Sequence, residues 1–299
     1  MRALITGAAG FVGGHLSAYA ADRGAEVVGP SREQLDLLDA GAVAATVADV
    51  KPDAVFHLAA LASVGESWSA PAETLDNNTR ATLNLLEAVR EAAPDAVVLA
   101  AGSGEQYGPV PEERLPVTED EPFRPQNPYA VSKAAADLLC GFYADAHGLR
   151  VIRTRAFNHA GPGQSDAYVI AAFARQIAAT ERAGSGELVL ETGNLEPRRD
   201  FTDVRDVVRA YWLAVERGEP AIFNVCSGVS VAVADILARL AALTELRVEQ
   251  RTDPSRLRKH EVMDIRGSHE RLTAATGWAP EIALDRTLAD TLDWWRANG

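Results

Sequence analysis

Short apolar runs alternate with longer amphipathic segments through the first half of the chain. The pattern predicts buried strands, each a short and nearly continuous apolar run, at residues 2–6, 25–31, 54–60, 96–103 and 150–157. Helical spacing of apolar residues predicts helices between them, at residues 11–24, near 40–50, at 71–94 and at 128–147, the last ending near Gly148. Strands that are apolar on both faces and alternate with helices indicate an α/β fold, a doubly wound parallel sheet covered on both sides.

The pattern becomes less regular after residue 160. We expect a loop at 159–166, a helix at 167–182, a strand–loop–strand segment at 186–206, a helix at 204–217 and a strand at 221–227. Residues 228–299 predict two or three helices joined by a charged loop. We therefore expect a cofactor-binding domain at 1–160, to which 200–227 return, and a smaller C-terminal substrate-binding lobe at 161–199 and 228–299.

Composition narrows the classes of function. The chain has 299 residues and a net charge of −13, which argues against a basic face for nucleic acid. No apolar run approaches the ~20 residues of a membrane span, and no signal peptide fits the start, so we expect a cytoplasmic protein. Cys140 and Cys226 lack metal or redox spacing and are expected as buried free thiols, and we expect no metal site.

Three glycines follow the first predicted strand directly. Gly7, Gly10 and Gly13 form a GxxGxxG pattern that opens the first helix. Such a turn lets the backbone approach a pyrophosphate at a helix N-terminus, which predicts a dinucleotide site. The alternative is a glycine-rich turn that serves only close packing.

The end of the second predicted strand bears on the choice of cofactor. Dinucleotide sites that take NAD usually place an acidic residue there for the ribose hydroxyl, whereas this chain has Gly29, Pro30, Ser31 and Arg32. A guanidinium at Arg32 can pair with a 2′-phosphate, so we expect NADP(H), with NAD(H) as the alternative. The other interpretation is a solvated loop arginine.

Tyr129 precedes Lys133 by one helical turn in the segment NPYAVSKAAAD. Residues at this spacing share a helix face, and an ammonium beside a phenol lowers the pKa of the phenol. Tyr129 could then exchange a proton with a substrate oxygen while a hydride moves. Ser103, at the end of a predicted strand, is the candidate to orient that oxygen, and Glu105 in the same loop is a candidate second base.

Taken together, these motifs resemble the extended short-chain dehydrogenases/reductases over essentially the full length. The resemblance rests on TGAAGFVGG, HLAA at 57–60, NNTRATLNLLEAV at 77–89, SGEQYG at 103–108, YAVSK at 129–133 and FNHAGPG at 157–163. It implies a Rossmann-type sheet and a cofactor site that includes Tyr129, Lys133 and a set of loop residues: Gly7, Gly10, Phe11, Val12, Gly13, Ser31, Arg32, Asp36, Leu37, Leu58, Ala59 and Ala60.

The C-terminal half is similar to the group of GDP-mannose 4,6-dehydratases and GDP-4-keto-6-deoxy-mannose reductases, through TRAFNHAGPGQS, GNLEPRRDFTDVRDVVRAYW, FNVCSG and LRKHEV. The resemblance implies a GDP-sugar substrate. It also implies contacts of diphosphate and nucleoside with Asn158, Asn194, Arg199, Arg258 and Glu261, besides Ser103 at the sugar. The alternative is that these arginines belong to a charged surface without a role in substrate binding. Gly104 departs from the group, which usually has serine at that position.

The short cofactor turn and the length of the chain favour a reductase that forms GDP-rhamnose from GDP-4-keto-6-deoxy-mannose. A 4,6-dehydratase or a 4-epimerase remains the alternative, because Ser103, Glu105, Tyr129 and Lys133 could serve those reactions too. A non-enzymatic scaffold is a third interpretation, but such proteins typically lose the tyrosine or the lysine.

Helices 71–93 and 128–147 carry apolar stripes, and the resemblance implies a homodimer through them; the alternative is that they only cover the sheet.

Overall fold

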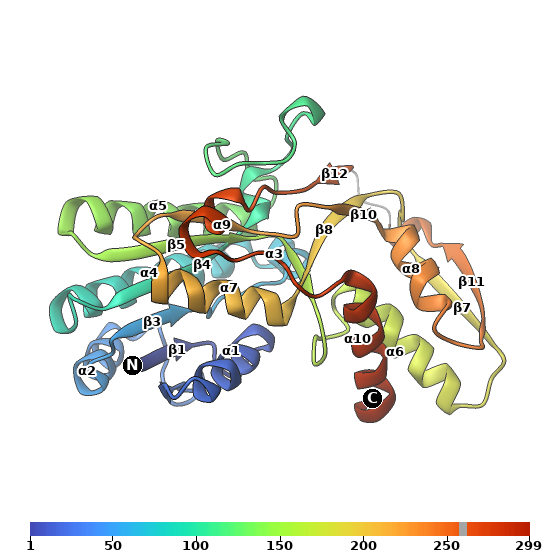
Figure 1. Ribbon diagram of the computed structural model, residues 1–299, viewed down its shortest axis with the longest axis horizontal. Helices are drawn as coiled ribbons and strands as arrows, with labels where there is room; N and C mark the ends of the chain where they lie inside the picture. Colours follow the sequence, from blue (N-terminus) through green and yellow to red (C-terminus); the bar gives the residue numbers. More distant parts are fainter. Residues whose placement is uncertain (257–261) are drawn as a thin grey trace.

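A parallel sheet of six strands runs through the N-terminal part of the protein (Figure 1). The computed structural model describes residues 1–256 and 262–299. The strand order is β2-β1-β3-β4-β5-β9, and every neighbouring pair is parallel. The strands are β1 (Arg2–Thr6), β2 (Glu26–Val28), β3 (Ala54–His57), β4 (Val97–Ser103), β5 (Arg150–Ala156) and β9 (Ile222–Val225). Their carboxyl ends meet at one edge, where open parallel sheets bind ligands.

Helices cover both faces of this sheet, as the alternation of apolar residues requires. Ile5, Phe56 and Leu99 pack with α1 (Phe11–Asp22) and α7 (Val204–Arg217) in one core. Leu4, Val55 and Val98, one position along each strand, pack in a second core with the helices α2 (Ala40–Val50), α4 (Pro71–Ala92) and α5 (Pro128–His147). Successive strand residues point to opposite faces, so each strand supplies both cores. The doubly wound α/β fold is confirmed.

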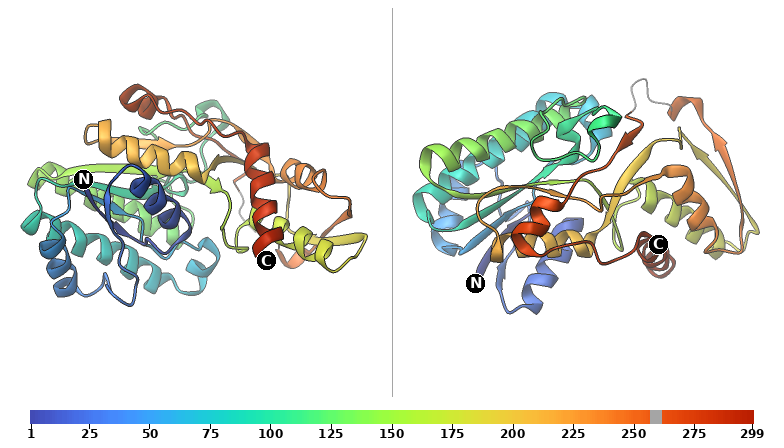
Figure 2. Two further views of the ribbon diagram at one scale, coloured as in Figure 1. Left: turned by 60° about the horizontal axis from the view of Figure 1, so that its bottom comes forward. Right: turned by 45° about the horizontal axis from the view of Figure 1, so that its top comes forward.

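A smaller lobe lies beside the sheet (Figure 2). Its core joins residues of α6 (Val169–Arg182), α8 (Val233–Ala241) and α10 (Leu284–Asn298). Strand β7 (Glu187–Thr192) pairs with β11 (Arg247–Thr252). A further sheet has the order β10-β8-β12, with β6 also paired to β8; its members are β6 (Asn158–Ala160), β8 (Arg198–Asp203), β10 (Ser230–Ala232) and β12 (Asp264–Ile265).

Several predicted elements differ in extent from the observed ones. The predicted strand 25–31 ends at Val28, before Gly29 and Pro30. The predicted strand 54–60 ends at His57, because the chain there crosses over the glycine turn: a Cβ on Gly7 would lie 2.8 Å from the Ala59 nitrogen. The predicted loop 159–166 begins inside strand β6.

Other elements were not predicted at all. Helix α3 (Val64–Ser69) begins at Ser63, whose hydroxyl accepts a hydrogen bond from the Glu66 amide. Two or three helices are expected in the C-terminal segment, and its described residues form three, with α9 (Glu270–Thr276) between the other two, together with three strands. Each of these strands has two to six residues, too short for a clear periodicity. Short 3₁₀ turns lie at Gly104–Tyr107 (η1), Glu112–Arg114 (η2) and Pro254–Arg256 (η3).

Two smaller expectations can be checked directly. Both cysteines are buried and free. Among the residues that the structure describes, no helix combines the length and the apolar character needed to cross a bilayer.

Candidate active site

The glycine turn leaves no room for side chains. Gly7 has φ +77°, and a Cβ on Gly13 would lie 2.1 Å from the Gly7 carbonyl oxygen. Gly10 precedes α1 and caps it without a side-chain hydrogen bond. The first amides of a helix have no partner within the helix, so these amides are available to an anion. The turn therefore has the geometry of a phosphate cradle.

A cavity of about 350 Å³ opens beside this turn. Its lining includes eight of the predicted cofactor residues: Gly7, Gly10, Ser31, Arg32, Asp36, Leu37, Ala59 and Ala60. Sequence reasoning missed the rest of the lining, which is Thr6, Ala9, Pro30, Leu35, Leu61, Asn77 and Ala81. The other predicted cofactor residues do not line it: Phe11, Val12, Gly13, Leu58, Tyr129 and Lys133. The missed residues are mostly small or apolar and flank the predicted ones, so no chemical signal marks them in the sequence.

Arg32 lies at the rim of the cavity with an exposed side chain. Within the described part of the chain, its guanidinium forms no hydrogen bond or ion pair. Its neighbour Ser31 is held by Gln34, whose side-chain oxygen accepts from the Ser31 amide at 2.8 Å. The loop is therefore ordered, and it presents an exposed guanidinium of the kind that pairs with a phosphate.

Tyr129 and Lys133 stand one turn apart on the first half of α5, at the carboxyl edge of the sheet. Asn127 caps this helix, because its side-chain oxygen accepts from the Ala130 amide at 2.8 Å, and Pro128 occupies the first helical position. The Lys133 Nζ donates to the Ala101 carbonyl oxygen in β4 at 2.8 Å. Burial lowers the pKa of Lys133 from 10.5 to about 8.

The side chain of Ser103 lies near the Tyr129 phenol, close enough to act on its pKa. Ser103 is the last residue of β4 and is buried, so strand and helix bring the two groups together. Burial raises the pKa of Tyr129 well above its usual value, and the neighbouring Ser103 side chain lowers it by less. In the protein alone, burial therefore outweighs any lowering of the Tyr129 pKa by Lys133, whose ammonium donates to the Ala101 carbonyl oxygen.

Glu105 lies in the turn η1, directly after Ser103. Its Oε2 accepts from the Asn127 Nδ2 at 3.1 Å, and its negative charge contributes to the raised pKa of Tyr129. The glycine between Ser103 and Glu105 has a steric reason, since a Cβ on Gly104 would lie 3.2 Å from the Phe157 ring. Serine at this position would require Phe157 to move.

A buried polar chain beneath the site was not predicted. The two ring nitrogens of His57 are bonded to Thr6 Oγ1 at 2.8 Å and to Thr82 Oγ1 at 3.1 Å. Burial, followed by the charge of Lys133, lowers the pKa of His57 to about 3, so this ring stays neutral. Asn78 of α4 donates to the Ser132 hydroxyl at 2.9 Å and thereby ties α4 to α5. The motif HLAA contains His57, and NNTRATLNLLEAV contains Asn78 and Thr82, but spacing alone gives these three residues no role.

Two of the predicted substrate residues lie on paired strands, and a third lies in the loop after β7. Asn158 lies in β6, which pairs with β8, the strand that contains Arg199. The Arg199 guanidinium donates to the Val262 carbonyl oxygen at 2.7 Å. Asn194 follows β7, and its side-chain oxygen accepts from the Glu196 amide at 3.0 Å. Arg258 and Glu261 lie outside the described residues.

Comparison with known proteins agrees with this geometry. Residues 3–226 match the model of the NAD dependent epimerase/dehydratase family. The chain belongs to this family, and its fold and site are those of an NAD(P)-dependent oxidoreductase of the extended short-chain type. Membership confirms the resemblance that the motifs indicated.

Among the individual relatives, the chain is 41% identical to a GDP-6-deoxy-D-mannose reductase from Pseudomonas aeruginosa, over 99% of this chain and 98% of the relative. It is 26% identical to a GDP-mannose 4,6-dehydratase from Yersinia enterocolitica, over 97% and 92% of the two chains. Among solved structures, Pseudomonas aeruginosa RMD in complex with NADPH superposes with a TM-score of 0.91, 40% identity and coverage of 100% and 99%.

Proposed function

We propose that the protein is an NADP(H)-dependent reductase that converts GDP-4-keto-6-deoxy-mannose to GDP-rhamnose. The observation that carries the reaction class is the grouping of Ser103, Tyr129 and Lys133 at the carboxyl edge of the sheet, where α5 meets the end of β4. The full-length similarity to a protein named GDP-6-deoxy-D-mannose reductase supports the substrate.

The residues present fit a bound dinucleotide. The turn at Gly7, Gly10 and Gly13 has the close backbone approach that a pyrophosphate needs, and the unpaired Arg32 suits the 2′-phosphate of NADP(H). Bound NADPH supplies a hydride to the keto carbon of the substrate. The neighbour solved with NADPH supports the preference for the phosphorylated cofactor, with NAD(H) as the alternative.

Tyr129 is suited to give a proton. Because burial raises its pKa, the phenol keeps its proton at neutral pH. In the reduction, the keto oxygen, held by the Ser103 hydroxyl, gains negative charge and takes the proton from Tyr129. Lys133 is charged below pH 8 and stabilises the phenolate that remains until water reprotonates it.

The smaller lobe is the proposed site of the nucleoside diphosphate. Asn158 and Arg199 lie on the paired strands β6 and β8, and Asn194 lies in the loop after β7; they supply two amides and a guanidinium. Arginine pairs well with diphosphate oxygens, and Arg258 and Glu261 complete the proposed set for diphosphate and base. The division into a cofactor part, 1–160 with 200–227, and a nucleotide-sugar lobe, 161–199 and 228–299, belongs to this proposal.

A 4,6-dehydratase is the second candidate. Glu105 accepts a hydrogen bond from Asn127 and lies near enough to Tyr129 for its charge to raise the pKa of the phenol. In a dehydratase this carboxylate would remove the C5 proton. Against it, the match to the dehydratase extends over 346 positions, more than the 299 residues of this chain, which indicates insertions that the chain lacks. The same catalytic residues would also serve a 4-epimerase.

We also propose that the protein is a cytoplasmic homodimer. The faces of α4 and α5 expose Leu83 (37%), Val131 (40%), Leu138 (63%) and Phe142 (56%). The last three recur at helical spacing along α5, and a second copy of these helices would cover them.

Replacement of the tyrosine tests the enzymatic role. We expect Tyr129→Phe to lose at least about 10²-fold in kcat, the usual contribution of a positioned proton donor. NADPH affinity should stay within about twofold of wild type, because a phenyl ring keeps the shape of the site. Stopped-flow kinetics and fluorescence titration with NADPH measure the two quantities. Unchanged turnover would remove Tyr129 from the reaction.

A further inference from the structure

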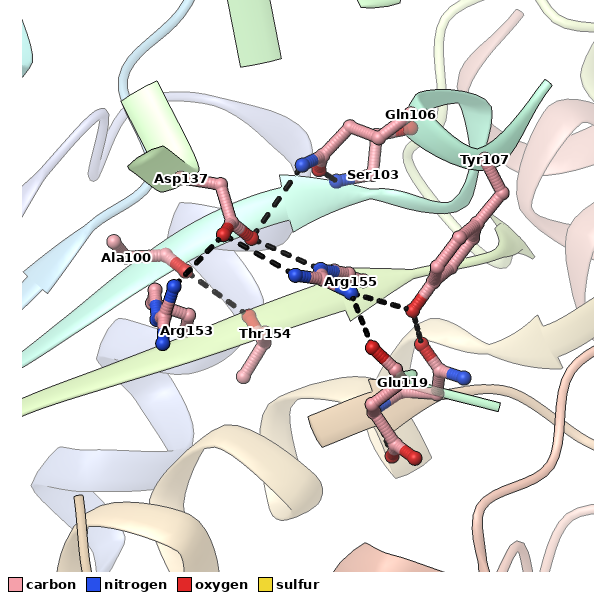
Figure 3. Close-up of polar contacts among 10 residues, drawn as sticks. Ala100, Ser103, Gln106, Tyr107, Glu119, Asp137, Arg153, Thr154 and Arg155 are labelled. Carbon is pink, nitrogen blue, oxygen red and sulfur yellow. Dashed lines mark hydrogen bonds and ion pairs between the residues drawn. The ribbon is translucent and has the colours of Figure 1, made fainter. Parts of the chain in front are cut away.

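The Gln106 side chain is hydrogen-bonded to the backbone of the loop that contains Ser103. The side-chain oxygen of Gln106 accepts from the Ser103 amide at 2.6 Å (Figure 3). The Ser103 hydroxyl accepts from the Glu105 amide at 3.2 Å. This reciprocal capping pattern fixes the backbone of Ser103 at the start of η1. Gln106 is fully buried, and a Cβ on Gly102 would lie only 2.6 Å from its side-chain oxygen. The end of β4 is therefore shaped to receive this amide.

The other end of the Gln106 amide is oriented by the catalytic helix. Its Nε2 donates to the Asp137 Oδ2 at 3.4 Å. Asp137 lies one turn after Lys133 and two turns after Tyr129, on the same face of α5. A carboxylate accepts but cannot donate, so it selects the amide orientation that leaves the oxygen for Ser103. One side chain thus connects the Ser103 loop to the helix that bears Tyr129.

Asp137 is in turn fixed by two arginines of β5. Arg155 donates to both of its oxygens, from Nε at 2.9 Å and from Nη2 at 3.2 Å, and Arg153 donates at 3.2 Å. The Arg155 guanidinium also donates at 3.0 Å to the Tyr107 hydroxyl, in the same 3₁₀ turn as Gln106. Figure 3 shows these groups converging between β4, β5 and α5.

A buried ion pair is weak evidence for stability, because apolar residues of similar volume often serve the fold as well. This one contacts three elements whose relative placement sets the Ser103–Tyr129 geometry. We propose that Gln106 and Asp137 are positioning residues: they hold Ser103 where its hydroxyl can be shared by Tyr129 and the substrate oxygen. The inference rests on the proposed reductase function and deepens it, since neither side chain has an assigned contact with substrate or cofactor.

A double-mutant cycle tests the inference. Gln106→Leu keeps the volume but removes both hydrogen bonds. We expect kcat to fall about tenfold or more, with KM for the sugar nucleotide and NADPH affinity within about twofold of wild type. In the Ser103→Ala background the same replacement should cost less than about twofold, because Gln106 acts through Ser103. The proposal would be overturned if the two replacements lowered kcat by independent factors that multiply. It would also be overturned if Gln106→Leu alone left kcat unchanged.

Two further variants separate positioning from general damage. Gln176→Leu in α6 removes a partly buried amide that donates to the Ala172 carbonyl, and it should keep wild-type kcat. Gln106→Glu should retain activity at low pH, where the new carboxyl is protonated and can still donate to Asp137. Activity should fall as pH rises and the two carboxylates repel. A flat profile, equal to that of wild type, would contradict the proposal even if Gln106→Leu does not fold.

A substrate-independent readout distinguishes failure of this inference from failure of the proposed function. Amide hydrogen exchange of residues 101–108 should accelerate about tenfold or more in Gln106→Leu, while residues 5–15 of the glycine turn exchange as in wild type. If wild type does not reduce the keto sugar but this exchange difference is found, the function is wrong and the positioning stands. Equal exchange at 101–108 in both proteins would overturn the positioning role.

Discussion

At the scale of single residues, burial moves the pKa values of Tyr129 and Lys133 in opposite directions. It disfavours the ionised form of each group, so it raises the pKa of the Tyr129 phenol and lowers the pKa of Lys133 to about 8. Near neutral pH the tyrosine keeps its proton and most of the lysine keeps its charge. That is the state from which a ketone can be reduced and protonated. The spacing of the two residues predicts their shared face, whereas the size of the desolvation effect depends on packing that sequence does not show.

Lys133 gives a pH dependence of stability. The folded state releases its proton near pH 8 and the unfolded state near 10.5, so between these values the unfolded state binds more protons. The free energy of unfolding attributable to Lys133 therefore rises with pH across this window and is constant below it. We compare the free energy of unfolding in urea of wild type and Lys133→Met at pH 7 and pH 10. The value for wild type, relative to that of the variant, should be higher at pH 10 than at pH 7. A difference independent of pH would contradict the lowered pKa.

Arg32 tests the choice of cofactor. If its guanidinium pairs with the 2′-phosphate, Arg32→Ala should weaken NADPH binding by about 10–100-fold, the equivalent of the ~1.5–3 kcal/mol of a hydrogen bond to a charged group. NADH binding should change little. The control, Arg247→Ala, removes an exposed arginine of β11 that pairs with Glu187 and should affect neither cofactor. Equal effects of Arg32→Ala on both cofactors would identify Arg32 as a solvated loop arginine.

At the scale of elements, predictability follows the length of the pattern. Strand β4 and helix α5 place Ser103, Tyr129 and Lys133 together, and both were predicted from long periodic runs. The strands of the smaller lobe were largely missed, because β6, β10 and β12 have only two or three residues and exist through pairing with β8. Gln106 and Asp137 lie in or beside predicted elements, but their contact crosses between a 3₁₀ turn and a helix. No local pattern encodes such a contact.

At the scale of the whole molecule, the protein has a cofactor cavity at the sheet edge and a smaller lobe whose strands β6 and β8 carry polar residues. The apolar face of α4 and α5 lies on the outer side of the sheet, away from α1 and α7, which cover the other face (Figure 1). A homodimer through this face would leave the catalytic edge of each copy accessible.

Light scattering tests the dimer. Wild type should have twice the mass of the chain, and Leu138→Glu combined with Phe142→Glu should be monomeric, because the charges would be buried between copies. The control, Leu243→Glu, places a charge at a similarly exposed leucine (40%) of the smaller lobe and should remain dimeric. A monomeric wild type at micromolar concentration, or dimeric double variant, would contradict the proposed interface.

Reduction of a keto sugar can be measured directly. Purified protein is mixed with NADPH and freshly prepared GDP-4-keto-6-deoxy-mannose while nicotinamide absorbance is followed, and a parallel sample contains GDP-mannose and NADP⁺ with products analysed by mass. We predict stoichiometric loss of NADPH in the first sample and unchanged GDP-mannose in the second. Stable NADPH in the first, together with water eliminated from GDP-mannose in the second, would contradict the reductase and make Glu105 the base of a dehydratase.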